Sequence, residues 1–118
     1  MNRNRHWATT MSERAKALLD VAKRHGVIID SRAFLVPASR LVSFLEDANN
    51  EQVDVPYFDC LFLSDTATRP SMSLSSSPKD WESFAAMIEF ARSAAEQAIA
   101  EAAQEGSTAY FEVGGEGE

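Results

Sequence analysis

Cysteine is nearly absent from the sequence, which contains Cys60 alone. A single cysteine excludes an internal disulfide framework and is typical of a reducing compartment, so we expect a cytoplasmic location. Histidine is scarce as well, with only His6 and His25. One cysteine and two histidines do not make a standard structural zinc site, and we expect no bound metal.

Long apolar runs are also missing. No segment approaches the roughly 20 apolar residues needed to span a bilayer, so we expect no membrane association. The basic N-terminus, MNRNRHW, is not followed by a continuous apolar segment and does not have the pattern of a secretory signal.

Motifs of catalysis and cofactor binding are absent. The glycines stand singly or at the C-terminus, so there is no phosphate-binding loop, and no zinc-protease helix, nucleophile elbow or EF-hand occurs. Cys60 lies in an apolar strand pattern, which predicts a buried, unreactive thiol, and Asp59 is predicted to be a surface charge. We therefore expect no enzyme activity and no cofactor. A cleft built from His25, Asp59 and a serine stays open as an alternative, because a sequence gives no distances.

Positive charge is scarce after residue 40. Residues 1–40 contain eight Lys or Arg and three acids, a net charge of +5, whereas residues 41–118 contain three Lys or Arg and fifteen acids, a net charge of −12. Such a separation concerns partners and association rates rather than fold. One interpretation is a chance bias of a solvated surface. The other is an acidic surface that meets a basic partner, or two copies that pair head to tail.

What is present in abundance is a helical pattern over residues 77–105. Ser77 is placed as the N-cap, Pro78 at the first helical position and Gly106 as the left-handed stop. The helix would be roughly 40 Å long. Its half near Gly106 is nearly all alanine, which favours close approach of a strand, another helix or a second copy. The apolar side chains share one broad face: Trp81, Phe84, Ala85, Met87, Ile88, Ala91, Ala94, Ala95, Ala98, Ile99 and Ala102.

Two shorter helices are predicted in the N-terminal part. The first begins at Thr10, which has capping-box spacing to Glu13, and ends at Gly26, with His25 capping its carboxyl end. The second begins at Ala38 and ends at residues 49–50. Residues 22–27 have a weak similarity to the turn of a helix-turn-helix, but the β-branched run after them and Pro37 oppose that motif.

The remaining patterns predict strands. Residues 27–36 fit two short strands, or a strand and a helical turn. Residues 53–64 predict a central strand with two apolar faces, and residues 71–75 its hairpin partner, with Met72 and Leu74 inward. Residues 108–113 alternate as a last strand.

The predicted fold is α+β: an antiparallel sheet of three or four strands packed on one long C-terminal helix, with two shorter N-terminal helices. We expect a single domain over residues 1–118, with residues 1–9 as a flexible basic arm and residues 114–118 as a flexible acidic tail.

The charge layout favours a non-enzymatic protein-binding module or inhibitor. It would present an acidic surface to a basic partner protein, including one that otherwise binds nucleic acid, by offering carboxylates in place of phosphates. The predicted contact residues are acids in and before the long helix: Asp80, Glu82, Glu89, Glu96, Glu101 and Glu105.

Two alternatives use other parts of the chain. In the first, the basic N-terminal segment binds nucleic acid, a less favoured partner, through Arg3, Arg5, Trp7, Lys23 and Arg24, since arginine and tryptophan suit phosphates and bases. In the second, the chain is a homodimeric structural or assembly factor that pairs through the alanine-rich end of the long helix.

Overall fold

The fold is α+β, as predicted, with a sheet of five antiparallel strands rather than three or four. A computed structural model describes residues 11–117. The strands are β1 (Ile28–Asp30), β2 (Ala33–Pro37), β3 (Phe58–Leu63), β4 (Thr68–Ser76) and β5 (Thr108–Gly115), and their order in the sheet is β1-β2-β5-β3-β4. The last strand of the chain therefore takes the central place that was predicted for residues 53–64. Sequence patterns do not reveal such long-range pairing.

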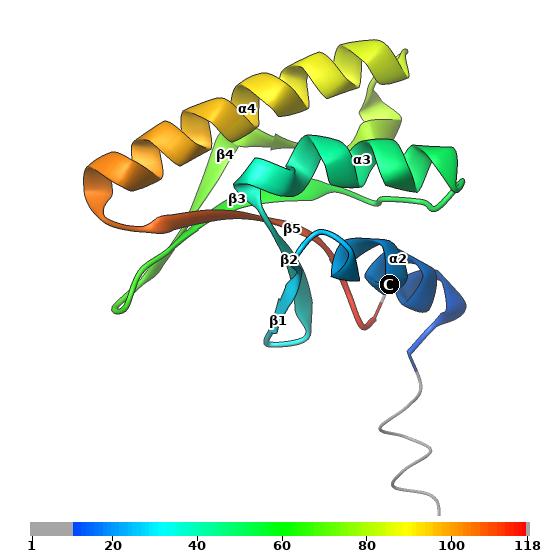
Figure 1. Ribbon diagram of the computed structural model, residues 1–118, viewed down its shortest axis with the longest axis horizontal. Coiled ribbons are helices and arrows are strands. Elements are labelled where there is room, and N and C mark those ends of the chain that lie inside the picture. Colours follow the sequence, from blue (N-terminus) through cyan, green and yellow to red (C-terminus); the bar gives the residue numbers. More distant parts are fainter. Residues whose placement is uncertain (1–10, 118) are drawn as a thin grey trace, which may run out of the picture.

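The helices cover one face of the sheet. They are α2 (Glu13–Lys23), α3 (Leu41–Asn50) and α4 (Phe84–Glu105), with short 3-10 turns η1 (Ala38–Arg40) and η2 (Pro78–Asp80). Figure 1 shows α3 and α4 above the sheet, with α2 beside α3. Residues of α2, α3 and α4 share one core with the inward side chains of β3 and β5. The largest fully buried residues of that core are Phe34, Phe44, Phe58, Phe62 and Phe111.

Within residues 11–117, no helix lies over the opposite face of the sheet. Phe58, Cys60 and Phe62 are buried as the alternation predicts, but Leu61 and Leu63 are only half-buried. The expectation that both faces of β3 are covered is therefore wrong. A second layer within residues 11–117 therefore does not account for the second apolar face.

The long helix begins six residues later than predicted, and its cap is Ser83. The Ser83 hydroxyl accepts from the Ala86 amide at 3.1 Å. Ser77 instead donates its hydroxyl to the Pro56 carbonyl at 3.0 Å, and the Trp81 indole N–H donates to Ser76 Oγ at 2.8 Å. These tertiary bonds hold residues 77–83 in η2 and extended backbone, so α4 has 22 residues and a length of about 33 Å.

The carboxyl half of α4 packs inside the molecule. Gly106 ends the helix with a φ of 75°, as predicted. The small side chains of this half let α4 lie close to η1 and β5. Phe84 and Ile99, predicted to be inside, are 37% and 45% exposed. The buried stripe of α4 is Met87, Ile88, Ala91, Ala94, Ala95, Ala98 and Ala102.

The first helix begins after the predicted cap. Ser12, not Thr10, is the N-cap of α2, because its hydroxyl accepts from the Ala15 amide at 3.0 Å. Gly26 closes the helix end as predicted: it has a φ of 77°, and the next amide, of Val27, donates to the Ala22 carbonyl.

Residues 27–36 form the hairpin of β1 and β2. Ser31 and Arg32 have φ angles of 51° and 73°, the left-handed pair that a tight two-residue hairpin turn requires. The end of the chain packs against this turn. Gly115 pairs with Ala33, and the Glu116 amide donates to the Arg32 carbonyl at 3.0 Å. The prediction of a flexible tail from residue 114 is thus wrong for residues 114–116.

The hairpin of β3 and β4 is confirmed, but Met72 points outward and is 84% exposed. The register shifts between Phe58, which pairs with Ser76, and Cys60, which pairs with Ser71. Within this bulge Ser75 Oγ accepts from the Cys60 amide and donates to the Ser71 carbonyl. The hydroxyl replaces ladder hydrogen bonds, so the strict alternation of residues 71–75 does not translate into alternating burial.

Candidate functional site

The six acids predicted to form one surface fall into three groups. Asp80 and Glu82 lie before α4, and Glu89 and Glu96 lie on its outward side, all of them exposed. Glu89 is 3.9 Å from Arg92 of the same helix. The outward side of α4 therefore has little net charge.

Glu101 and Glu105 turn toward β4 instead. Nη2 of Arg69 donates to both carboxylates, at 2.7 Å for Glu105. A hydrogen bond from the Ser107 hydroxyl, and then the Arg69 guanidinium, lowers the pKa of Glu105. These two acids are largely satisfied within the molecule, and Arg69, which also lies over the Phe62 ring at 4.4 Å, ties β4 to α4.

His25 is the buried member of a partly buried clamp rather than a helix cap. It is 5% exposed, with Nε2 2.7 Å from Asp47 Oδ2 and Nδ1 3.1 Å from Arg40 Nη2. Arginine can only donate, so Nδ1 accepts and Nε2 carries the proton that is donated to Asp47. The ring also meets Phe44 edge-on, at 6.2 Å between centroids. The clamp joins the end of α2 to α3.

The catalytic cleft left open by the sequence does not form. His25 lies among the helices, whereas Asp59 alternates with the buried Phe58 and Cys60 and so points from the opposite face of the sheet. Cys60 is buried as predicted, and burial raises the pKa of its thiol to about 11.

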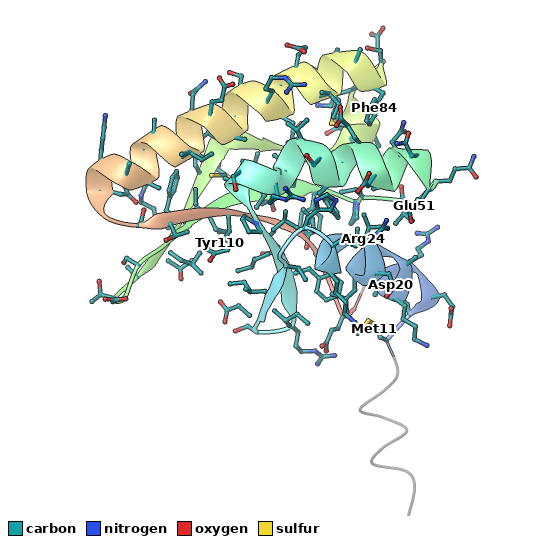
Figure 2. All side chains as sticks on the ribbon, in the orientation of Figure 1. Met11, Asp20, Arg24, Glu51, Phe84 and Tyr110 are labelled. Atoms are coloured by element: carbon teal, nitrogen blue, oxygen red, sulfur yellow. The ribbon has the colours of Figure 1, made fainter. Side chains whose placement is uncertain are left out.

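The alternative nucleic-acid contacts are only partly within the described residues. Arg3, Arg5 and Trp7 lie outside them. Lys23 and Arg24 are exposed at the end of α2, where Arg24 pairs with Glu51 at 2.6 Å (Figure 2).

A pocket that sequence reasoning missed lies between the end of α3 and the start of α4. We call it the α3–α4 pocket; its volume is about 300 Å³. Figure 2 shows Phe84 at its α4 side. Most of its wall is apolar, and its lining residues come from three segments: Leu45, Ala48, Asn49, Val53, Asp54, Val55, Pro78, Lys79, Trp81, Ser83, Phe84 and Met87.

The walls of the pocket are held by local bonds. Trp81 is fixed by its bond to Ser76 and by the Phe90 ring, 5.3 Å away between centroids. The Val53 amide donates to the Ala48 carbonyl at 2.8 Å, and Gln52 takes a φ of 59° to let the chain turn back. The cavity is therefore preformed rather than dependent on a mobile loop.

Acidic groups outnumber basic ones in and near the pocket. Asp54 and Lys79 line it. Exposed Asp80 and Glu82 do not line it, but they are the sequence neighbours of the lining residues Lys79, Trp81 and Ser83 and so lie close to it. The sequence signal that could have found the pocket is the closely spaced set of Pro78, Trp81 and Phe84, of which helical periodicity assigned Trp81 and Phe84 to the core.

The arrangement suits an apolar side chain better than a metal or a charged small molecule. Within residues 11–117, no three His, Cys, Asp or Glu side chains gather to hold a metal ion. None of the helices in the same range combines the length and hydropathy needed to cross a bilayer.

Comparison of the chain with protein-family models, curated proteins and solved structures finds no match.

Proposed function

We propose that this protein is a non-enzymatic protein-binding module that takes an apolar side chain from a basic segment of a partner into the α3–α4 pocket. The observation that carries the proposal is a mainly apolar pocket of about 300 Å³ that has Asp54 in its lining. The pocket supplies the energy and the nearby acids supply the charge preference.

Burial of an apolar side chain in the pocket would supply the binding energy. Enclosing one leucine or phenylalanine side chain contributes about 1.5–3 kcal/mol. Anchors of this kind dominate protein interfaces when they enter preformed pockets. Phe84 is 37% exposed at the mouth and would be covered by such an anchor.

The charge preference comes from acids near the pocket and from the whole chain. Asp54 lines the pocket, Asp80 and Glu82 are exposed next to lining residues in the sequence, and the chain has a net charge of −7. Complementary charge raises association rates and rejects acidic partners. A basic segment that otherwise contacts nucleic acid is one partner of this kind, and covering it would make the protein an inhibitor.

The experiment uses Trp81 as its own reporter. The chain has two tryptophans, so a Trp7→Phe variant leaves Trp81 as the only one. Peptides are selected from a random displayed library on the full chain, and their binding is followed through Trp81 fluorescence. Selected peptides should combine an apolar residue with lysine or arginine, and their affinity should fall as salt rises.

Matched variants locate the contact. Phe84→Asp should abolish binding, and Asp80→Asn with Glu82→Gln should weaken it, whereas Glu89→Gln with Glu96→Gln on the outward side of α4 should not. Peptides that bind without altering Trp81 fluorescence, or equally well to Phe84→Asp, would overturn the proposal.

The two alternatives have less support. Arg24, one of the described candidates for phosphate contact, already pairs with Glu51. The alanines proposed for a dimer contact, such as Ala94, Ala98 and Ala102, are buried within one chain, so pairing would depend on Ile99 and its exposed neighbours.

A further inference from the structure

A second apolar surface lies on the side of the sheet away from the helices. We call it the open sheet face; the register of β2, β5 and β3 brings together Leu35, Pro37, Asp59, Leu61, Leu63, Thr108, Tyr110 and Glu112. Figure 2 shows Tyr110 on the side of β5 away from α3 and α4. None of these eight residues except Leu35 is fully buried.

The middle of this face is more apolar than a solvated face should be. An antiparallel sheet with one face in water normally alternates apolar and polar residues. Here Leu61 lies opposite Tyr110, with Pro37 of β2 on the other side of Tyr110 and Pro70 of β4 on the other side of Leu61. The four side chains form a continuous strip across neighbouring strands.

One end of the strip is acidic. Asp59 lies directly opposite Glu112, and two like charges in that position destabilise a sheet. The Tyr57 hydroxyl donates to Glu112 Oε2 at 2.7 Å. Partial burial, and secondarily the Glu112 charge, raises the pKa of Asp59. None of the eight residues of the face is lysine or arginine, so the face itself supplies no cation to this pair.

We infer that the open sheet face binds an amphipathic segment of a partner protein, with apolar side chains over Leu61 and Tyr110 and a lysine or arginine between Asp59 and Glu112. A cation at that position would relieve the repulsion and form charged hydrogen bonds. A second copy of this chain fits less well. Its open sheet face would bring the same two acids and would contribute no lysine or arginine.

This surface is separate from the α3–α4 pocket, which lies on the helical side, so the inference goes beyond the proposed function and does not depend on it. Both the pocket and the open sheet face favour basic partner segments. Different residues form the two surfaces, so a substitution in one surface leaves the other unchanged.

The test selects random 16-residue displayed peptides on the full chain and removes those that also bind a Leu61→Ser, Tyr110→Ser variant. The remaining peptides depend on the open sheet face. We expect them to carry lysine or arginine beside apolar residues. Their affinity should fall about tenfold on Asp59→Asn with Glu112→Gln, the effect of losing a charged contact, and stay unchanged on Phe84→Asp.

Three results would overturn the inference. One is that no peptide survives the counter-selection. Another is that the surviving peptides lack positive charge or bind the Asp59→Asn, Glu112→Gln variant equally well. The third is a dimer in sedimentation velocity that dissociates on Leu61→Ser, which would assign the face to a second copy. Circular dichroism of each variant separates loss of binding from loss of fold.

Discussion

At the scale of single residues, Asp59 and Cys60 show how strand alternation gives neighbours opposite environments. Cys60 points into the core and is fully buried, while Asp59 points out from the open sheet face and remains exposed. Burial raises the pKa of both groups, because it disfavours the charged form of an acid. The consequences for stability appear in different pH ranges.

For Cys60 the pKa is raised from 9.0 to about 11. The thiol ionises first in the unfolded chain, so its contribution is complete below about pH 9 and is lost as pH rises toward 11. The loss has a limiting slope of about 1.4 kcal/mol per pH unit. Urea unfolding between these pH values should give a steeper decline for the wild type than for Cys60→Ala, whose other titrating groups are the same. If the free energy of unfolding fell equally with pH in the wild type and in Cys60→Ala, burial of the thiol would be contradicted.

For Asp59 the raised pKa means that the charged carboxylate destabilises the folded state. Asp59→Asn should therefore be more stable than the wild type at about pH 7, and the advantage should shrink as pH falls through the folded pKa of Asp59. Urea unfolding at several pH values measures the difference. Asp20→Asn on the exposed side of α2 serves as the control. An Asp59→Asn variant that is less stable at neutral pH would show that the carboxylate already has a favourable partner.

At the scale of elements, the position of a helix start is decided by which serine has its hydroxyl free. Ser77 and Ser83 both precede apolar residues, but Ser77 is engaged with Pro56. Ser83→Ala should lower the free energy of unfolding by about 1 kcal/mol and weaken amide-exchange protection at Ala86. Ser93→Ala in the exposed middle of α4 should have little effect. If amide-exchange protection of α4 were lost in Ser77→Ala but kept in Ser83→Ala, the helix would begin at Ser77, as the sequence predicted.

The junction of β5 with the turn between β1 and β2 depends on a glycine. A Cβ at Gly115 would lie 2.8 Å from the Arg32 carbonyl oxygen, a backbone atom held in a tight turn. Gly115→Ala should therefore destabilise by about 1–3 kcal/mol, the range for overpacking. At Gly117 a Cβ meets nothing within 4 Å, so Gly117→Ala is the matched control. Equal urea midpoints for the two variants would show that the chain end is not packed as described.

The sequence was most informative where side chains alternate or repeat over several residues. Phe58, Cys60 and Phe62 alternate along β3, Phe111 and Val113 alternate along β5, and all five are buried, because period-two burial is a local property. The central place of β5 and the bulge at Met72 were missed, since both depend on pairing between distant segments.

At the scale of the whole molecule, charge counting predicted acidic side chains at the surface but not how they group. Glu101 and Glu105 look like their neighbours in the sequence, yet Arg69 from β4 binds both. The α3–α4 pocket was unpredictable for the same reason, because three separate segments build its wall. A site of this type is a property of the assembled layers.

Those layers separate the two proposed docking surfaces, so they should be occupied independently. The pocket lies on the helical side of the sheet and the open sheet face on the other. At physiological salt, exposed charges separated by more than about 8 Å are largely screened, so basic peptides bound on opposite sides of the sheet should repel each other little. Isothermal titration should give the same Kd for a pocket peptide with and without a saturating open-face peptide. Phe84→Asp should remove the first binding event alone, and Leu61→Ser the second alone. Mutual exclusion of the two peptides would mean that they share one surface, and the molecule would then offer a single docking site rather than a bridge between two partner segments.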